Sequence, residues 1–221
     1  MKNFTITDIT KNVFAVLAQH GQQLLTSLAI PFLLLFSVGI AFSDGQSNAI
    51  TLPFALLIST IQGIVALITH RISLAPDTVP TLGLNQFTMR EGIFLVYFVG
   101  IFGSINALQE MVFNLVGPLT FLLMAVVIIW VLSRISLTFP ALAVGDYVPL
   151  RSSWEMTKPF QRPMLMVVVV FPVVVSILLA PFVLLLPALL VLVQPLVTVV
   201  TIVALSLTYA HIRASQSSSE Q

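Results

Sequence analysis

Long apolar runs separated by short polar segments dominate this chain of 221 residues. A helix needs about 20 mostly apolar residues to cross a membrane, and successive runs approach that length. The last run extends from Met164 to Ala210, about two spans long, with Pro181 and Pro187 where the chain is expected to turn. The pattern predicts an all-α, polytopic membrane protein with six transmembrane helices, near residues 24–42, 51–69, 91–105, 116–132, 164–183 and 187–209.

Polar segments next to the spans predict short interfacial helices. At the start of the chain, Ile9, Val13 and Leu17 follow helical spacing, while Lys11 and Gln19 fall on the other side of the same helix. Such a helix can lie in the headgroup layer with its apolar side towards the lipid. The alternative is that it extends the first span into the cytosol.

Composition supports the membrane assignment. The chain is 58% hydrophobic and 8% charged, whereas soluble domains carry about 25% charged residues. A soluble protein of this size could not cover its surface with so few charges. We therefore expect one integral membrane domain over residues 1–213, followed by a disordered polar tail over residues 214–221.

Basic residues are distributed unevenly between the two predicted membrane faces. All 9 Lys and Arg residues fall on the side of the termini, and the opposite turns carry Asp44 and Glu110 but no Lys or Arg. Because loops rich in Lys and Arg stay in the cytoplasm, both termini are expected there. The net charge of +1 argues against nucleic-acid binding, and the lack of cysteine excludes disulfides and thiol chemistry.

The ends of the second, fourth and sixth predicted spans resemble one another. They read ITHRISL, VLSRISL and LTYAHIRAS, so each apolar helix closes on a Ser or His with an Arg close by. This similarity favours a unit of one interfacial segment and a two-helix hairpin, present three times. A physical cause can produce the same ends without repetition, because Arg favours a helix C-terminus and extends towards the headgroups.

Residues 132–162 form the longest segment that is neither a clean hydrophobic span nor a plain loop. Within it, Arg151, Glu155, Lys158 and Arg162 recur at spacings that place them on one polar face of a short helix. This face is expected to lie on anionic lipid or to contact a partner; the alternative is an ordinary interfacial linker that anchors the fifth span. The candidate lipid or partner contacts are Arg71, Arg134, Arg151, Trp154, Lys158 and Arg162.

A few polar residues are candidates for a site within the membrane. Asn106, Glu110 and Asn114 are each one helical turn apart. The six-span pattern places them in an exposed outer turn; if they are embedded instead, Glu110 becomes a candidate proton or cation site. Gln62 and Gln194 lie within the second and sixth spans, where they are expected to form hydrogen bonds between helices.

Motifs for catalysis are missing from the sequence. The chain has no P-loop, no GxGxxG, no GxSxG and no close carboxylate pair within a membrane segment. His20, His70 and His211 lack metal-binding spacing and are expected to be interfacial residues. We therefore predict a protein that is not an enzyme and that has no metal or cofactor.

The central segment also carries a resemblance to a known family. The segment contains Arg134 at the end of the fourth span, then Pro140 and Asp146, and then LRSSWEMT before the fifth span. This order resembles a pattern in the YciC-like inner-membrane proteins and in the membrane domain associated with glycerophosphodiester phosphodiesterases. The resemblance implies a bacterial inner-membrane location and an accessory or structural role. The phosphodiesterase chemistry lies in a separate soluble domain, for which this chain has no room, so that activity is not expected.

Two functions are open at this point. The leading prediction is a non-enzymatic membrane protein, an accessory or structural subunit, whose partners are membrane lipids and a membrane protein or a second copy of the chain. The alternative is a small transporter or permease subunit for a hydrophobic or lipid-like substrate. It is favoured by prolines that can break helices where a transport pathway needs them broken, namely Pro172, Pro181, Pro187 and Pro195.

Overall fold

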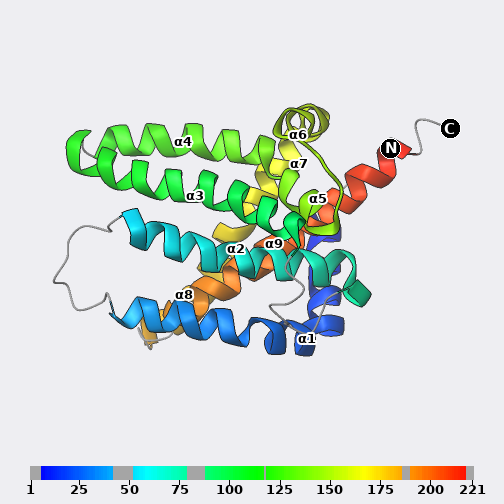
Figure 1. Ribbon diagram of the computed structural model, residues 1–221, viewed down its shortest axis with the longest axis horizontal. Helices are drawn as coiled ribbons and strands as arrows, with labels where there is room; N and C mark the ends of the chain where they lie inside the picture. The colour runs from blue at the N-terminus through cyan, green and yellow to red at the C-terminus, as the bar shows by residue number, and fades with distance from the viewer. Residues whose placement is uncertain (1–5, 42–51, 79–87, 117, 186–189, 218–221) are drawn as a thin grey trace.

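The computed structural model describes residues 6–41, 52–78, 88–116, 118–185 and 190–217, and within these ranges it contains helices and no strand (Figure 1). This confirms the all-α prediction. The long helices are α1 (Ile6–Ala41), α2 (Leu52–Leu74), α3 (Met89–Val116), α4 (Pro118–Ile135), α8 (Phe171–Leu185) and α9 (Leu190–Ser217). The short elements are η1 (Pro76–Thr78), α5 (Thr138–Val144), α6 (Leu150–Thr157), η3 (Lys158–Phe160), α7 (Gln161–Leu165) and the π-helical η4 (Met166–Val170).

Several of these helices are suited to a lipid environment. Five stretches of the described chain are long and apolar enough to cross a membrane: Thr7–Val38, Leu52–Leu74, Leu122–Val144, Leu150–Leu184 and Val193–Ser217. The length and composition of its helices therefore make the chain a multi-pass membrane protein. Helix α3 has 28 residues, enough for a crossing, but is not among the five. The number of six spans stays a prediction.

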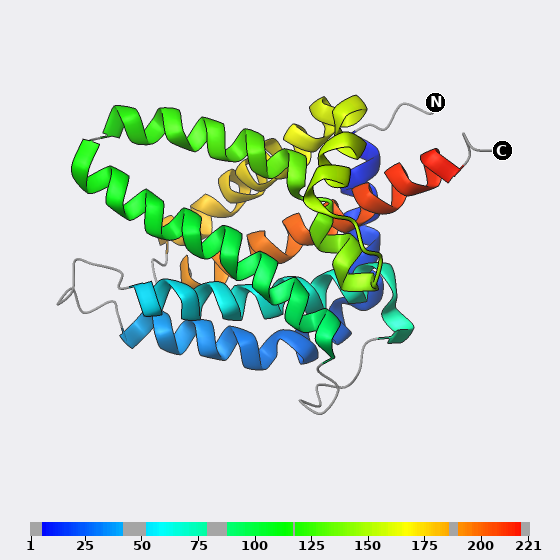
Figure 2. The ribbon, with the colours of Figure 1, turned by 45° about the horizontal axis from the view of Figure 1, so that its top comes forward.

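The long helices form antiparallel pairs, α1 with α2, α3 with α4 and α8 with α9 (Figures 1 and 2). Helix α2 is central, because it packs against α1, α3, α5 and α9. The described chain begins and ends at one end of the bundle, where α5, α6 and α7 also lie (Figure 2). We call this the basic end, because it contains Arg71, Arg134 and Arg213. The pairs correspond to the predicted hairpins, and their origin by repetition stays a prediction.

Helix α1 is continuous, but its N-terminal part crosses the direction of the remainder (Figures 1 and 2). Ile9 and Val13 are buried in the same apolar core as Tyr209 and Ile212 of α9, while Lys11 is exposed. The predicted two-sided character of this segment is therefore present. Its apolar side packs on protein, since α1 contacts α9, and the segment is a helical extension of the first span.

Helix α3 corrects one expectation. It runs without a break through Asn106, Glu110 and Asn114, and the chain reverses between Val116 and Pro118. The expectation that the three polar residues form an outer turn is therefore wrong. Asn and Glu are tolerated in a helix interior, whereas Pro is favoured at the first position of a helix, where its missing N–H would have had no helical partner.

The C-terminal end of α9 also differs from expectation. Helix α9 continues through Ser217, so residues 214–217 are helical and not part of a disordered tail. The Ser215 hydroxyl donates to the Ile212 carbonyl at 2.7 Å, and the Ser217 hydroxyl donates to the Ala214 carbonyl at 3.0 Å. These bonds occupy polar groups of the last turn, where a helix otherwise leaves carbonyls without helical partners. Residues 218–221 lie outside the described residues.

Helix α5 turns the chain back into the core after α4. Its residues 138–143 are all buried, and Phe139 contacts the rings of Phe94 and Phe98 of α3, with centroids 5.9 and 5.5 Å away. The helix ends at Gly145, which has φ +90° and donates to the Leu142 carbonyl at 3.2 Å. A side chain is disfavoured at this left-handed position, so glycine permits the sharp exit towards α6.

Candidate functional site

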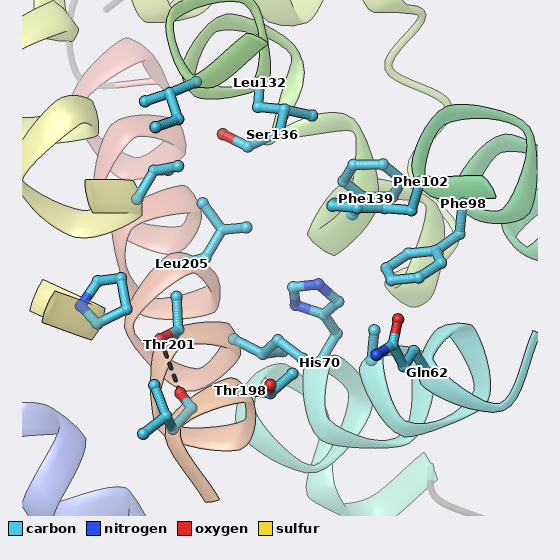
Figure 3. A pocket seen from close by; sticks show the side chains of 16 residues that line it. Gln62, His70, Phe98, Phe102, Leu132, Ser136, Phe139, Thr198, Thr201 and Leu205 are labelled. Atoms are coloured by element: carbon cyan, nitrogen blue, oxygen red, sulfur yellow. Dashed lines mark hydrogen bonds between the residues drawn. The ribbon is translucent and has the colours of Figure 1, made fainter. Parts of the chain in front are cut away.

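A cavity of about 380 Å³ lies between the helices (Figure 3). We call it the interhelical cavity. Its lining comes from α2, α3, α5 and α9, from the end of α4, and from Val168 of η4 and Pro172 of α8. The cavity exists because α5 folds in beside α2 and α3 while α9 packs on the other side of α2.

Most of the cavity wall is apolar. Phe98 and Phe102 of α3 stack with centroids 4.4 Å apart, and Phe139 of α5 lies 5.8 Å from Phe102. Leu132 and Leu205 complete this part of the wall (Figure 3). An apolar wall of this kind favours a ligand with a hydrocarbon or ring body. The ligand's apolar surface is removed from water when it enters the cavity, or exchanges its contacts with lipid for contacts with the wall.

His70 is the most deeply buried polar group at the cavity. It is 1% exposed, and its Nδ1 lies 2.7 Å from the Ser206 hydroxyl of α9. That hydroxyl also donates to the Ile202 carbonyl at 2.9 Å. Because a hydroxyl has one proton, Nδ1 of His70 is the donor to Ser206 when the Ser206 proton is on the Ile202 carbonyl. In the neutral ring, Nε2 is then an acceptor, and the imidazole points towards the cavity (Figure 3).

Hydroxyl groups add further acceptors. Thr198 donates to the Gln194 carbonyl at 3.0 Å, Thr201 donates to the Val197 carbonyl at 2.7 Å, and Ser136 donates to the Ser133 carbonyl at 3.3 Å. Each proton is thereby engaged by the backbone, and each oxygen keeps a lone pair. Together with Nε2 of His70, these oxygens make the cavity richer in acceptors than in donors. Gln62, whose amide has both, also lines the cavity.

The structure separates the residues that the sequence suggested for a polar site. Gln62 lines the cavity, whereas Gln194 is exposed on α9, and among the described residues its side chain has no hydrogen bond to another helix. Asn106 donates from Nδ2 to the Ser59 hydroxyl at 3.3 Å, which links α3 to α2. Glu110 lies within α3, and its side chain is outside the described residues. Of the three whose side chains the structure describes, only Gln62 lines the cavity.

Arg71 is a packed residue and not an open lipid contact. Its guanidinium pairs with Glu91, and the side chains of the two residues are 15% and 6% exposed. Nε of Arg71 also donates to the Ala143 carbonyl at 2.9 Å. Glu91 accepts the Thr88 N–H at 2.7 Å, so the same carboxylate caps α3 and holds Arg71. This pair joins α2, α3 and α5 at the basic end.

Arg213 has a comparable role on α9. Its Nη1 contacts the Asp146 carboxylate, and Asp146 also accepts the Tyr209 hydroxyl at 2.9 Å. Asp146 follows Gly145 in the link from α5 to α6. The contact therefore fastens the C-terminal helix to that link.

Arg134, in contrast, has no carboxylate partner in the part of the chain that the structure describes. It is 7% exposed, and its guanidinium carbon lies 6.0 Å from the Trp130 ring and 5.3 Å from the Trp154 ring. The other candidate contacts, Arg151, Lys158 and Arg162, are exposed on α6 and the elements that follow. Arg151 pairs with Glu155 at 3.4 Å, with side chains 91% and 67% exposed. The predicted polar face of this segment is therefore open.

Sequence reasoning missed most polar groups of the cavity. His70 was expected to be interfacial, and this expectation is wrong because α9 and α3 cover it. Ser136, Thr198 and Thr201 carry no pattern that distinguishes them from other hydroxyl residues of apolar helices. The sequence feature that could have indicated a polar site here is His70, a polar ring directly before the repeated Arg-Ile-Ser-Leu sequence.

Comparison with known proteins finds no matching family model, no matching curated protein and no matching solved structure. A function for the chain must therefore be argued from its own side chains.

Proposed function

We propose that this chain is a non-enzymatic membrane protein that binds a hydrophobic, lipid-like molecule bearing a hydroxyl or amine group in the interhelical cavity. The observation that carries the proposal is the cavity of about 380 Å³, with its apolar wall and its group of acceptors around His70. Small-molecule sites usually measure about 300–1,000 Å³ and combine apolar walls with a few placed polar groups.

The polar lining determines which ligand fits. A hydroxyl or amine buried without a partner costs roughly 1–3 kcal/mol in proteins. Nε2 of His70 and the oxygens of Thr198 and Thr201 can accept the protons of such a group. A pure hydrocarbon would leave these acceptors without a donor. A carboxylate would place its own acceptor oxygens against them, which is electrostatically unfavourable. The cavity therefore favours an amphiphile whose polar group donates.

The setting of the site is the bacterial inner membrane, with both termini in the cytoplasm and α3 as a sixth span. Arg71, Arg134 and Arg213 lie at one end of the bundle, and a face rich in Arg and Lys stays in the cytoplasm. Helix α3 pairs with α4 along the bundle and has sufficient length. The resemblance of LRSSWEMT to YciC-like proteins agrees with this setting and with an accessory role beside a protein partner.

The test is to identify what the purified protein carries. Wild-type protein extracted in mild detergent should retain a hydrophobic molecule with a hydroxyl or amine group, detected by native mass spectrometry. Thr201→Phe fills the cavity and should lower its occupancy about tenfold, equivalent to about 1.4 kcal/mol. Thr26→Phe is the matched control, because Thr26 makes the same type of bond to a carbonyl one turn earlier but is exposed on α1.

Two results would contradict this binding function. One is wild-type protein that carries no such molecule and takes none up. The other is equal occupancy in Thr201→Phe and Thr26→Phe.

A transporter of the same ligand is the second candidate function. The cavity wall includes Val168 of the π-helical segment and Pro172 at the start of α8. Such irregular helices often occur at functional sites and allow a helix to change shape. In a transporter, Gln62→Cys should react with a polar thiol reagent added from either side of the membrane. Reaction from neither side would reject transport and leave binding.

A further inference from the structure

Arg134 is a buried cation without a partner in the part of the chain that the structure describes. Its Nε and Nη1 are buried and have no hydrogen-bond acceptor. Three ion pairs of the described residues join Arg71 to Glu91, Arg151 to Glu155 and Arg213 to Asp146, and none of the three includes Arg134. A buried guanidinium is costly unless its charge and its N–H groups are satisfied.

The sequence around Trp154 holds this arginine in place. Ser153 of α6 donates its hydroxyl to the Arg134 carbonyl at 3.0 Å. One turn later, the Thr157 hydroxyl lies 3.1 Å from the same carbonyl and shares its single proton among this carbonyl and those of Ser153 and Trp154. This carbonyl belongs to the last turn of α4, where carbonyls lack helical partners. We call Ser153 and Thr157 the clamp, because their hydroxyls attach α6 to the end of α4 and so place Trp154 over the guanidinium. Trp130, one turn before Arg134, meets Trp154 edge to face with centroids 5.1 Å apart.

The two indoles satisfy only part of what a guanidinium requires. Aromatic faces attract its positive charge. They provide no lone pair for Nε and Nη1, which are the buried nitrogens without acceptors. An anionic group with oxygen acceptors supplies what such N–H groups lack, because its hydrogen bonds to a guanidinium are charge-assisted.

The position of the site favours phosphate as this group. Arg134 is in the last turn of α4 at the basic end. Lys158 and Arg162, four and eight positions after Trp154, are exposed on the elements that follow α6. Trp130 is 40% exposed, so the indole pair reaches the surface. Trp and Arg at this level of a membrane protein meet the headgroup layer, where phosphate is the abundant anion.

We propose that Arg134, which lies beside the paired indoles of Trp130 and Trp154, binds a phosphate group, and that its source is the headgroup of an anionic membrane phospholipid. This site is separate from the interhelical cavity. Leu132 and Ser136 line the cavity, and a residue two positions from each is turned by about 200° around the helix axis. The proposal therefore goes beyond the cavity ligand and does not depend on it.

Intrinsic fluorescence tests the proposal directly. The chain contains 2 Trp residues, and both belong to this site. Full-length protein in an uncharged detergent is titrated with phosphatidylglycerol, with inorganic phosphate and with diacylglycerol of the same acyl chains. Phosphatidylglycerol should cause a saturable change in Trp emission, and diacylglycerol should cause none. A change with inorganic phosphate alone would keep the phosphate site and identify free phosphate as its source.

Variants assign the response to the guanidinium. Arg134→Gln should abolish the saturable change. Arg134→Lys keeps the charge and the buried stem but loses the planar guanidinium, and should weaken binding about tenfold. Arg151→Gln is the control, because Arg151 is an exposed arginine of α6 whose ion pair is with Glu155. The affinity of this variant for phosphatidylglycerol should stay within about twofold of wild type.

Folding is checked by size-exclusion chromatography of each variant. If Arg134→Gln does not fold, Arg134→Lys decides the question. The proposal is overturned if Arg134→Lys binds as tightly as wild type, if diacylglycerol acts like phosphatidylglycerol, or if neither source of phosphate changes the emission. The last result would leave a carboxylate of another protein as the partner of Arg134. None of these outcomes affects the ligand test with Thr201→Phe.

Discussion

Arg71 and Arg134 begin the same four residues, Arg-Ile-Ser-Leu, near the ends of α2 and α4. Arg71 pairs with Glu91 and donates to the Ala143 carbonyl. Arg134 lies beside a pair of contacting indoles and has no acidic partner among the described residues. The two arginines thus share a local sequence and a position at a helix end, but not an electrostatic environment.

The difference comes from the segment that follows each arginine. After Arg71 the chain enters α3 through Thr88 and Glu91, a capping pair that places a carboxylate beside α2. After Arg134 it enters α6 through Ser153, Trp154 and Thr157, which offer two hydroxyls and a ring. The first arrangement completes an ion pair within the fold. The second arrangement leaves the Arg134 guanidinium without a counter-charge, which the proposed phosphate of a lipid headgroup supplies.

The largest expected effect is on the Arg71 side. Glu91→Gln removes the carboxylate and leaves the Arg71 guanidinium buried without its counter-charge. Removing one partner of a buried pair typically costs about 3–5 kcal/mol. The free energy of unfolding in detergent, measured by denaturant titration, should fall by about that amount. Arg71→Met combined with Glu91→Leu should recover much of it, and a loss below about 1 kcal/mol in Glu91→Gln alone would show that the pair is solvated.

A smaller effect is expected where α6 is clamped to Arg134. The double substitution Ser153→Ala and Thr157→Val removes both hydroxyls that donate to the Arg134 carbonyl. The Ser153 bond contributes about 1 kcal/mol and the shared Thr157 bond less, so the free energy of unfolding should fall by about 1–2 kcal/mol. Trp emission should shift to longer wavelength, because Trp154 is released from Arg134. Ser152→Ala, on the neighbouring half-buried residue of α6, is the control. Unchanged emission in the double variant would mean that the clamp does not position Trp154.

The third arginine extends the comparison to α9. This arginine is Arg213, and Asp146→Asn weakens the contacts that residue 146 makes with Arg213 and with the Tyr209 hydroxyl. Because the Arg213 and Asp146 side chains are 51% and 36% exposed, water screens the pair, and a loss of about 1 kcal/mol in the free energy of unfolding is expected. Tyr209→Phe should account for roughly half of that loss. A loss as large as that of Glu91→Gln would mean that burial does not distinguish the two pairs.

The smallest effect is expected at the exposed pair on α6. Glu155→Gln separates Glu155 from Arg151, whose side chain is 91% exposed. An exposed pair of this spacing contributes about 0.3–0.5 kcal/mol. Thermal unfolding in detergent should therefore be nearly unchanged, and the small difference should vanish at high salt. A loss above about 1 kcal/mol would assign this face a structural role.

Local properties of the sequence predicted much of the fold. The long apolar runs correspond to helices, and the predicted short helix around Trp154 is α6. The polar face through Arg151 and Glu155 is exposed as its spacing suggests. The predicted turn at Asn106–Asn114 is wrong, because α3 continues through these polar residues to Val116. A few polar side chains do not break a helix whose backbone bonds are complete within it.

The candidate site was far less predictable. Gln62 was noticed as a polar residue within a span, but its neighbours across the cavity come from other helices. The His70 and Ser206 pair is separated by 136 positions, and no local pattern connects the two residues. The Ser-Ser-Trp-x-x-Thr sequence was visible as part of a family resemblance. Its physical role, a clamp on the Arg134 carbonyl, depends on how α6 packs against α4.

By itself, the sequence determined that this is a helical protein of the membrane and which end of the bundle carries its arginines. These properties follow from the composition and period of neighbouring residues, which act before any long-range contact forms. Only the tertiary structure decided that α5 leaves a cavity beside α2 and that two identical Arg-Ile-Ser-Leu segments differ in their partners. The physical reason is that a side chain's electrostatic environment is set by the elements that pack on it, and those come from elsewhere in the chain.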